Sequence, residues 1–217
     1  MSKITAPLLS FGAGGQLANS LVYSSWKGIP YARRYVIPAN PRTNRQMVTR
    51  SIFKNLQTLW LMMPALGKAP WELNAEGRPY LPVNKFTGTN VKGVDTQTPP
   101  TDWSFFIGSP GAKGGLPPMG LALTGGANQI TAALTAPDIP DGWSITQAVA
   151  IAFKDGDPQA PYAGSVTAAF DASSPYSVVL TGLDAATDYV VSAWFEWERP
   201  DGTPAYSTSL TDIEATS

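Results

Sequence analysis

Hydrophobic residues recur at helical spacing in one long segment of this chain and at strand spacing in several others. Between Thr43 and Met63, apolar residues follow one another at steps of three or four: Val48, Ile52, Leu56, Leu59 and Met63. This spacing predicts an amphipathic α-helix, which Thr43 or Asn44 can cap. We expect it to be the only prominent helix, followed by a shorter helical turn from Pro70 to about Gly77.

Residues 21–36 alternate apolar and polar side chains around one strong turn signal. Lys27-Gly28 interrupts the alternation, so we expect a β-hairpin that turns there. Because successive strand residues point to opposite faces, Arg33 would lie on one face of the second strand and Arg34 on the other.

The C-terminal half alternates apolar and polar residues in short runs that turn signals separate. About seven strands in roughly 100 residues are typical of a β-sandwich. In the run that begins at Tyr189, every second residue would face the core. The intervening residues, among them Trp194, Glu196 and Glu198, would then face solvent.

These patterns predict a mainly β protein with one prominent helix and two domains. An N-terminal α+β domain would span residues 1–92, and a β-sandwich of the fibronectin III or immunoglobulin kind would span residues 115–217. Residues 93–114 are rich in Gly, Pro and Thr and poor in pattern, so we expect a linker there, pinned by aromatic residues such as Phe106.

Charge is divided unevenly between the two ends of the chain. The first 70 residues carry nine basic side chains and no acidic one, and the rest carries the other 6 basic and all 16 acidic side chains. We expect the basic end to meet an acidic surface and the acidic end to face outward.

The composition excludes several kinds of chemistry. The chain has no cysteine and no histidine, which excludes disulfides, thiolate metal sites and the Ser-His-Asp and Cys-His catalytic systems. We therefore expect no enzyme activity, no cofactor and no metal. No apolar run approaches the ~18 residues of a membrane span, and we expect a soluble chain made in a cytoplasm.

Four other short features have ordinary explanations beside functional ones. Asp155-Gly156-Asp157 resembles part of a calcium loop but lacks its further carboxylates, so a turn is favoured. Gly12-Ala13-Gly14-Gly15 lacks the Lys-Ser/Thr of a phosphate-binding loop. The pair Glu196 and Glu198 is expected on a solvated face, and Trp194, on the outward face by this alternation, is a disfavoured candidate for stacking on a glycan.

The segment Leu183-Asp184-Ala185-Ala186-Thr187-Asp188-Tyr189 resembles the L-x-P-x-T-x-Y corner of fibronectin type III domains, with Ala185 in the place of the proline. The resemblance implies that Leu183, Thr187 and Tyr189 form a structural corner, in which the tyrosine hydroxyl bonds to nearby backbone. It implies no function by itself.

Residues 20–92 resemble a class of bacteriophage and prophage virion proteins that share a W-K-G-x-x-Y-x-R hairpin, N-P-R-T, a Gln-containing helix, a Trp and Asn-x-Phe. The matching residues here are Trp26-Lys27-Gly28, Tyr31, Arg33, Asn40-Pro41-Arg42-Thr43, Gln46, Trp71 and Asn84-Lys85-Phe86. The resemblance implies a non-enzymatic virion structural protein, assembled in the host cytoplasm, and a head decoration (cement) protein is the favoured role.

Three explanations stay open for the basic residues: a solvated surface, an acidic protein neighbour, and nucleic acid, which is the least favoured because no nucleic-acid-binding motif is present. Under the second, the partners would be the major capsid protein, other virion subunits or further copies of this chain. The expected interface residues are Trp26, Lys27, Tyr31, Arg33, Arg34, Tyr35, Arg42, Arg45 and Arg50. The alternative function is a tail, neck or fibre protein whose sandwich binds a host glycan or surface protein.

Overall fold

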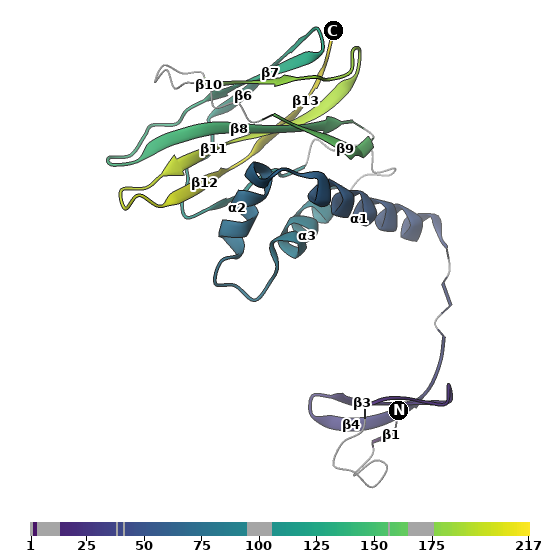
Figure 1. Ribbon diagram of the computed structural model, residues 1–217. Coiled ribbons are helices and arrows are strands. Elements are labelled where there is room, and N and C mark those ends of the chain that lie inside the picture. The colour runs from purple at the N-terminus through teal and green to yellow at the C-terminus, as the bar shows by residue number, and fades with distance from the viewer. Residues whose placement is uncertain are drawn as a thin grey trace. The chain divides into compact units, whose positions relative to one another are not determined.

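The computed structural model describes residues 2–3, 14–37, 39–40, 42–94, 106–155, 157–164 and 176–217. The chain forms two compact units, Met1–Arg42 and Thr43–Ser217 (Figure 1).

The first unit is a four-stranded antiparallel sheet. Its strands are β1 (Ser2–Lys3), β2 (Gly15–Leu17), β3 (Leu21–Trp26) and β4 (Ile29–Arg34), in the order β1-β4-β3-β2. The predicted hairpin is confirmed, because β3 and β4 are joined by Lys27-Gly28 alone. Both turn residues have positive φ, +49° and +77°, as the tightest hairpin turns require.

The second unit begins with three helices, α1 (Asn44–Met62), α2 (Ala65–Ala75) and α3 (Pro82–Val94). The predicted helix is confirmed as α1, and the Thr43 hydroxyl caps it by accepting the Gln46 N–H. The expectation of a single prominent helix is wrong. Pro70 lies inside α2 rather than at its start. Helix α3 is rich in Gly, Thr and Asn, which have low helix propensity, so it owes its stability to packing.

Two antiparallel sheets complete the second unit. The three-stranded sheet has the order β10-β7-β6, with β6 (Gly120–Gly126), β7 (Gln129–Thr135) and β10 (Tyr176–Thr181). The six-stranded sheet has the order β5-β12-β11-β8-β9, and β13 also pairs with β11. Its strands are β5 (Pro110–Ala112), β8 (Ser144–Lys154), β9 (Asp157–Gly164), β11 (Asp188–Glu198), β12 (Pro204–Thr208) and β13 (Leu210–Ala215).

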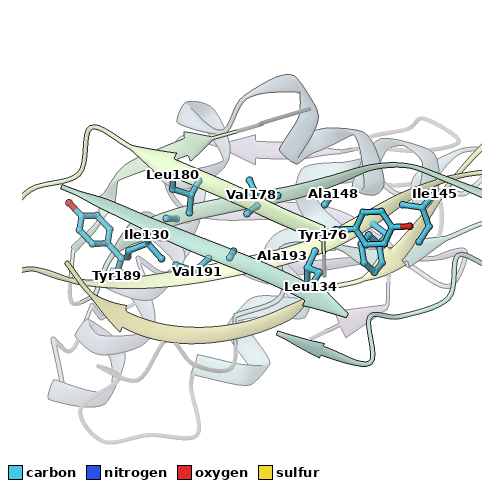
Figure 2. Close-up of a cluster of buried hydrophobic side chains, with 14 of the residues drawn as sticks. Ile130, Leu134, Ile145, Ala148, Tyr176, Val178, Leu180, Tyr189, Val191 and Ala193 are labelled. Atoms are coloured by element: carbon cyan, nitrogen blue, oxygen red, sulfur yellow. The ribbon is translucent and has the colours of Figure 1, made fainter. Parts of the chain in front are cut away.

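The core between the sheets confirms the predicted β-sandwich. Ile130 and Leu134 of the three-stranded sheet, with Val178 and Leu180, are buried against Val191 and other residues of the six-stranded sheet (Figure 2). In Figure 2, Tyr189 lies at one end of this core and Tyr176 at the other.

The helices cover the other face of the six-stranded sheet (Figure 1). A second core there joins residues of all three helices to β8 and β11: Ile52, Leu56, Leu59, Trp71, Phe86, Val149, Ile151, Phe153, Val190 and Trp194. The expectation that Trp194 faces solvent is therefore wrong, since its side chain is 0% exposed. The alternation along β11 predicted that the strand has two different faces, but it could not show that helices cover the second face.

Because of this second core, the observed units differ from the domains expected over residues 1–92 and 115–217. Because helices and sandwich share buried side chains, the structure groups them in one unit that begins at Thr43. Phe106, expected in a linker, packs between Phe86 and Phe153, with ring centroids 5.9 and 4.9 Å apart. Strand β5, also in the expected linker, joins the sheet. Residues 95–105 of that linker lie outside the described residues.

Candidate assembly surface

The nine residues expected at an interface fall in both units. Seven lie in the first unit: Trp26, Lys27, Tyr31, Arg33, Arg34, Tyr35 and Arg42. The other two, Arg45 and Arg50, lie on α1 in the second unit and are exposed.

The sheet of the first unit has little hydrophobic core of its own. Among its residues whose burial is described, Ala32 is the buried one. Trp26 is 69% exposed and its cross-strand partner Ile29 is 46% exposed. A sheet normally needs a second layer against which to bury one face. The described sheet therefore presents apolar surface that suits a partner.

Strand register assigns the side chains of this sheet to two faces. Directly paired residues share a face, and the pairs Val22↔Arg33, Ser24↔Tyr31 and Trp26↔Ile29 define the one that we call the Trp26 face. The opposite face holds Leu21↔Arg34 and Tyr23↔Ala32. The structure thus separates Arg33 from Arg34, as expected, while Lys27 lies in the turn.

Tyr35 and Arg42 follow the sheet. The backbone N–H of Tyr35 donates to the carbonyl of Ser20 at 2.8 Å, which holds this half-buried residue against the sheet. Arg42 is exposed at the last position of the unit. Two exposed apolar residues that sequence reasoning did not select, Val36 and Ile37, come directly after Tyr35. The sequence did contain a signal for them, because two apolar residues directly follow a basic strand.

The helical layer is basic too. Residues 43–94 contain seven basic and two acidic side chains. On α1, Arg50 and Lys54 are exposed on the side opposite the buried stripe, and the exposed Met47 and Leu61 lie on the same side of the helix. A mixture of apolar and basic side chains suits an acidic protein neighbour and solvent alike.

The sandwich carries the opposite charge. Residues 106–217 contain three basic and twelve acidic side chains. Each of the three basic side chains is paired with a carboxylate: Lys113 with Glu76 at 3.2 Å, Lys154 with Asp184, and Arg199 with Asp201 at 2.9 Å. These exposed pairs stabilise little. They do show that the few cations of the sandwich are neutralised, two by its own carboxylates and Lys113 by Glu76 at the end of α2, so the sandwich keeps a surplus of carboxylates.

Two carboxylates of the sandwich interact with hydroxyl groups. Hydrogen bonds from Thr203, first from its side chain, lower the pKa of Asp201. Burial and the neighbouring Glu196 raise the pKa of Tyr206 to about 12. Glu196 also accepts a hydrogen bond from the Gln147 amide and is only half-exposed. The expected pair of solvated glutamates is therefore correct for Glu198 alone.

Acidic clusters and surface hollows are the other features at which chemistry could take place. The described residues contain no group of three or more acidic residues that could hold a metal ion. Gly156 of the calcium-like turn and residues 12–13 of the glycine-rich segment lie outside the described residues. A shallow hollow beside α3 is lined by Tyr80, Asn84, Lys85 and Lys92, with no carboxylate to act as a base. No helix in the described part of the chain is long and apolar enough to cross a membrane.

The predicted structural corner is present. The Tyr189 hydroxyl accepts the backbone N–H of Asp184 at 2.9 Å, and Leu183 is buried. The Thr187 hydroxyl donates to the carbonyl of Ala185 at 3.0 Å. These contacts fix the turn that leads into β11.

Sequence reasoning missed the polar contacts that join the layers. Asn90 of α3 is fully buried, and its amide oxygen accepts the backbone N–H of Ile107 at 2.7 Å. The Trp71 indole N–H donates to the Gly108 carbonyl at 2.7 Å. A lone Asn among small polar residues offers no signal in one sequence, because its partner lies in a segment that has no pattern.

Comparison with known proteins adds little to this description. No protein-family model matches the chain, and no curated protein matches it. The chain is similar to a solved structure from a study of the computer-based redesign of a β-sandwich protein, with 18% sequence identity and a TM-score of 0.34. That similarity covers 48% of this chain and 91% of the other.

Proposed function

We propose that this chain is a non-enzymatic structural protein of a bacteriophage virion, and that it decorates the capsid. It docks through its basic N-terminal part and projects the acidic sandwich outward. Its partners are the major capsid protein or another virion subunit, and it resides in the virion.

The observation that carries this proposal is the basic sheet with little core. Residues 1–42 contain five basic side chains and no acidic one. The exposed Trp26 and Ile29 give this sheet apolar area to bury, and Arg33 and Arg34 tolerate desolvation better than lysines would. A small sheet of this kind gains stability when a partner supplies the missing layer.

The residues of the virion-like motif divide into two groups in the structure. Trp26 and Arg33 are exposed on the Trp26 face. Trp71 and Phe86 are fully buried and pack edge to face, with ring centroids 5.2 Å apart. We expect this division in a protein whose buried motif residues hold the fold together while its exposed motif residues bind a partner.

The sandwich supports a fibronectin III-like or immunoglobulin-like assignment. A three-stranded sheet faces a larger one in which β8 and β11 are central neighbours, and the tyrosine corner precedes β11. Strand β5 and the helical layer are additions to that plan. The burial of Trp194 removes the residue on which a glycan-binding role for the sandwich was based.

In docking on a particle, apolar and charged groups have different roles. Burial of exposed apolar side chains of the sheet supplies affinity. The arginines steer the approach and fix the register, and salt weakens their effect. No step requires a catalytic group, a metal or a cofactor.

An add-back experiment tests this function. The protein is stripped from particles, wild type or variant is returned, and occupancy is measured over a salt series. We expect Arg33, Arg34 and Arg50 changed together to Glu to lower occupancy at low salt, and the matched change to Lys to lower it much less. Equal occupancy of the two variants would refute electrostatic docking. Full occupancy by residues 43–217 alone would refute docking through the sheet.

A further inference from the structure

Within the first unit, no described element covers the Trp26 face, and its composition suits a protein partner. Trp26, Tyr31 and Arg33 belong to the three residue types that dominate interface energetics, and they lie on one face of adjacent strands. Trp26 and Ile29 form the exposed apolar part, beside the hairpin turn. Arg33, which pairs with Val22, adds a cation to this face.

One end of the sandwich carries the complementary features. The β7–β8 loop contains the exposed residues Asp138, Ile139 and Asp141, and the β11–β12 turn contains Asp201. The two loops lie side by side, because Gly142 approaches the ring of Pro200 closely. We call this part of the surface the loop end.

The loop end also exposes apolar surface. Met119 is 74% exposed, and its backbone N–H donates to the carbonyl of Thr135, directly before the β7–β8 loop. Ile139 in that loop is 47% exposed. Two cations lie near this end, and both are paired: Arg199 with Asp201, over the Trp143 ring, and Lys113 with Glu76. The loop end is therefore apolar and acidic, while the Trp26 face is apolar and basic.

We propose that the Trp26 face of one copy docks on the loop end of a second copy of this chain. The two surfaces match in charge and in apolar content, and each chain carries one of each. The contact is therefore head-to-tail, and repetition of it produces rings or rows of copies. The proposal rests on the proposed function: the partner of the Trp26 face is another copy in the virion assembly, and the opposite face of the sheet, with Arg34, is left for the shell.

Self-association of the purified full-length chain tests the proposal without particles. Sedimentation velocity over a concentration series measures the dissociation constant. We expect wild type to associate and added salt to weaken the association. Arg33→Glu should weaken it roughly tenfold, because a charge pair becomes a repulsion. The matched control Arg34→Glu, with the same change on the other face of β4, should have a much smaller effect.

Charge exchange separates this contact from other modes of association. A variant with Asp138→Lys and Asp141→Lys should also associate more weakly than wild type when it is alone. A mixture of this variant with Arg33→Glu should associate again, because each altered surface then meets one of opposite charge. A chain that stays monomeric at every concentration, or a mixture that shows no recovery, overturns the proposal. Capsid decoration by a monomeric chain would leave the proposed function standing and overturn this inference alone.

Discussion

Replacement of Asn90 by Leu should destabilise the second unit by about 2–4 kcal/mol. Asn90 is buried, and its amide exchanges two hydrogen bonds with the backbone of Ile107, at 2.7 and 3.2 Å. Leucine nearly preserves the side-chain volume but leaves the N–H and the carbonyl of Ile107 without these partners. Each unsatisfied buried group costs about 1–3 kcal/mol. Ile107 is half-buried, which favours the lower half of the summed range.

Urea denaturation, followed by tryptophan fluorescence and by far-ultraviolet circular dichroism, measures this effect. The matched control is Asn84→Leu, an exposed position on the same helix, which should change the free energy of unfolding by less than about 0.5 kcal/mol. If Asn90→Leu were as stable as this control, the amide would not hold α3 to the sandwich. The shared core would also be refuted if the second unit of the wild type, Thr43–Ser217, unfolded in two separate transitions.

Three further predictions follow from particular contacts. Tyr189→Phe should lower the free energy of unfolding by about 1 kcal/mol, because the corner hydrogen bond is lost. An unchanged denaturation midpoint would show that this hydrogen bond does not stabilise the corner. Burial raises the pKa of Tyr206 from 10.0 to about 12, so the stability it contributes is complete below pH 10 and lost as the pH rises through about 12. Tyr206→Phe should remove that part of the pH dependence of the melting temperature. Gly125→Ala should destabilise the protein by about 1–3 kcal/mol, because its Cβ would overlap the carbonyl oxygen of Ala215. Gly88→Ala, in open space on α3, should stabilise it by about 0.5–1 kcal/mol. Effects of the same sign for the two variants would contradict the local geometry.

The features predicted correctly from the sequence are those that depend on local pattern. The helix from Asn44 to Met62 combines a regular apolar stripe with a threonine cap. The hairpin at Lys27-Gly28 combines alternation with a turn pair that accepts positive φ. The corner at Tyr189 combines a motif with a contact only five residues distant. In each case the stabilising contacts lie within a few residues of the signal.

The features missed depend on contacts between distant segments. Helix α3 has weak propensity and forms where Phe86 and Asn90 meet the segment around Phe106. Trp194 was assigned to solvent because alternation cannot show that helices cover the second face of β11. The same helices remove the expected domain boundary. Of the candidate interface, the exposure of Trp26 and the opposite faces of Arg33 and Arg34 were predictable; the exposed loop end was not.

The position of the C-terminus on an assembled particle tests the central claim most directly. A label at Ser217 is imaged by electron microscopy on intact virions. The account predicts label on the outside of the head, farther from the particle centre than the shell. Label on the tail or neck, or particles without the protein, would contradict capsid decoration by this chain.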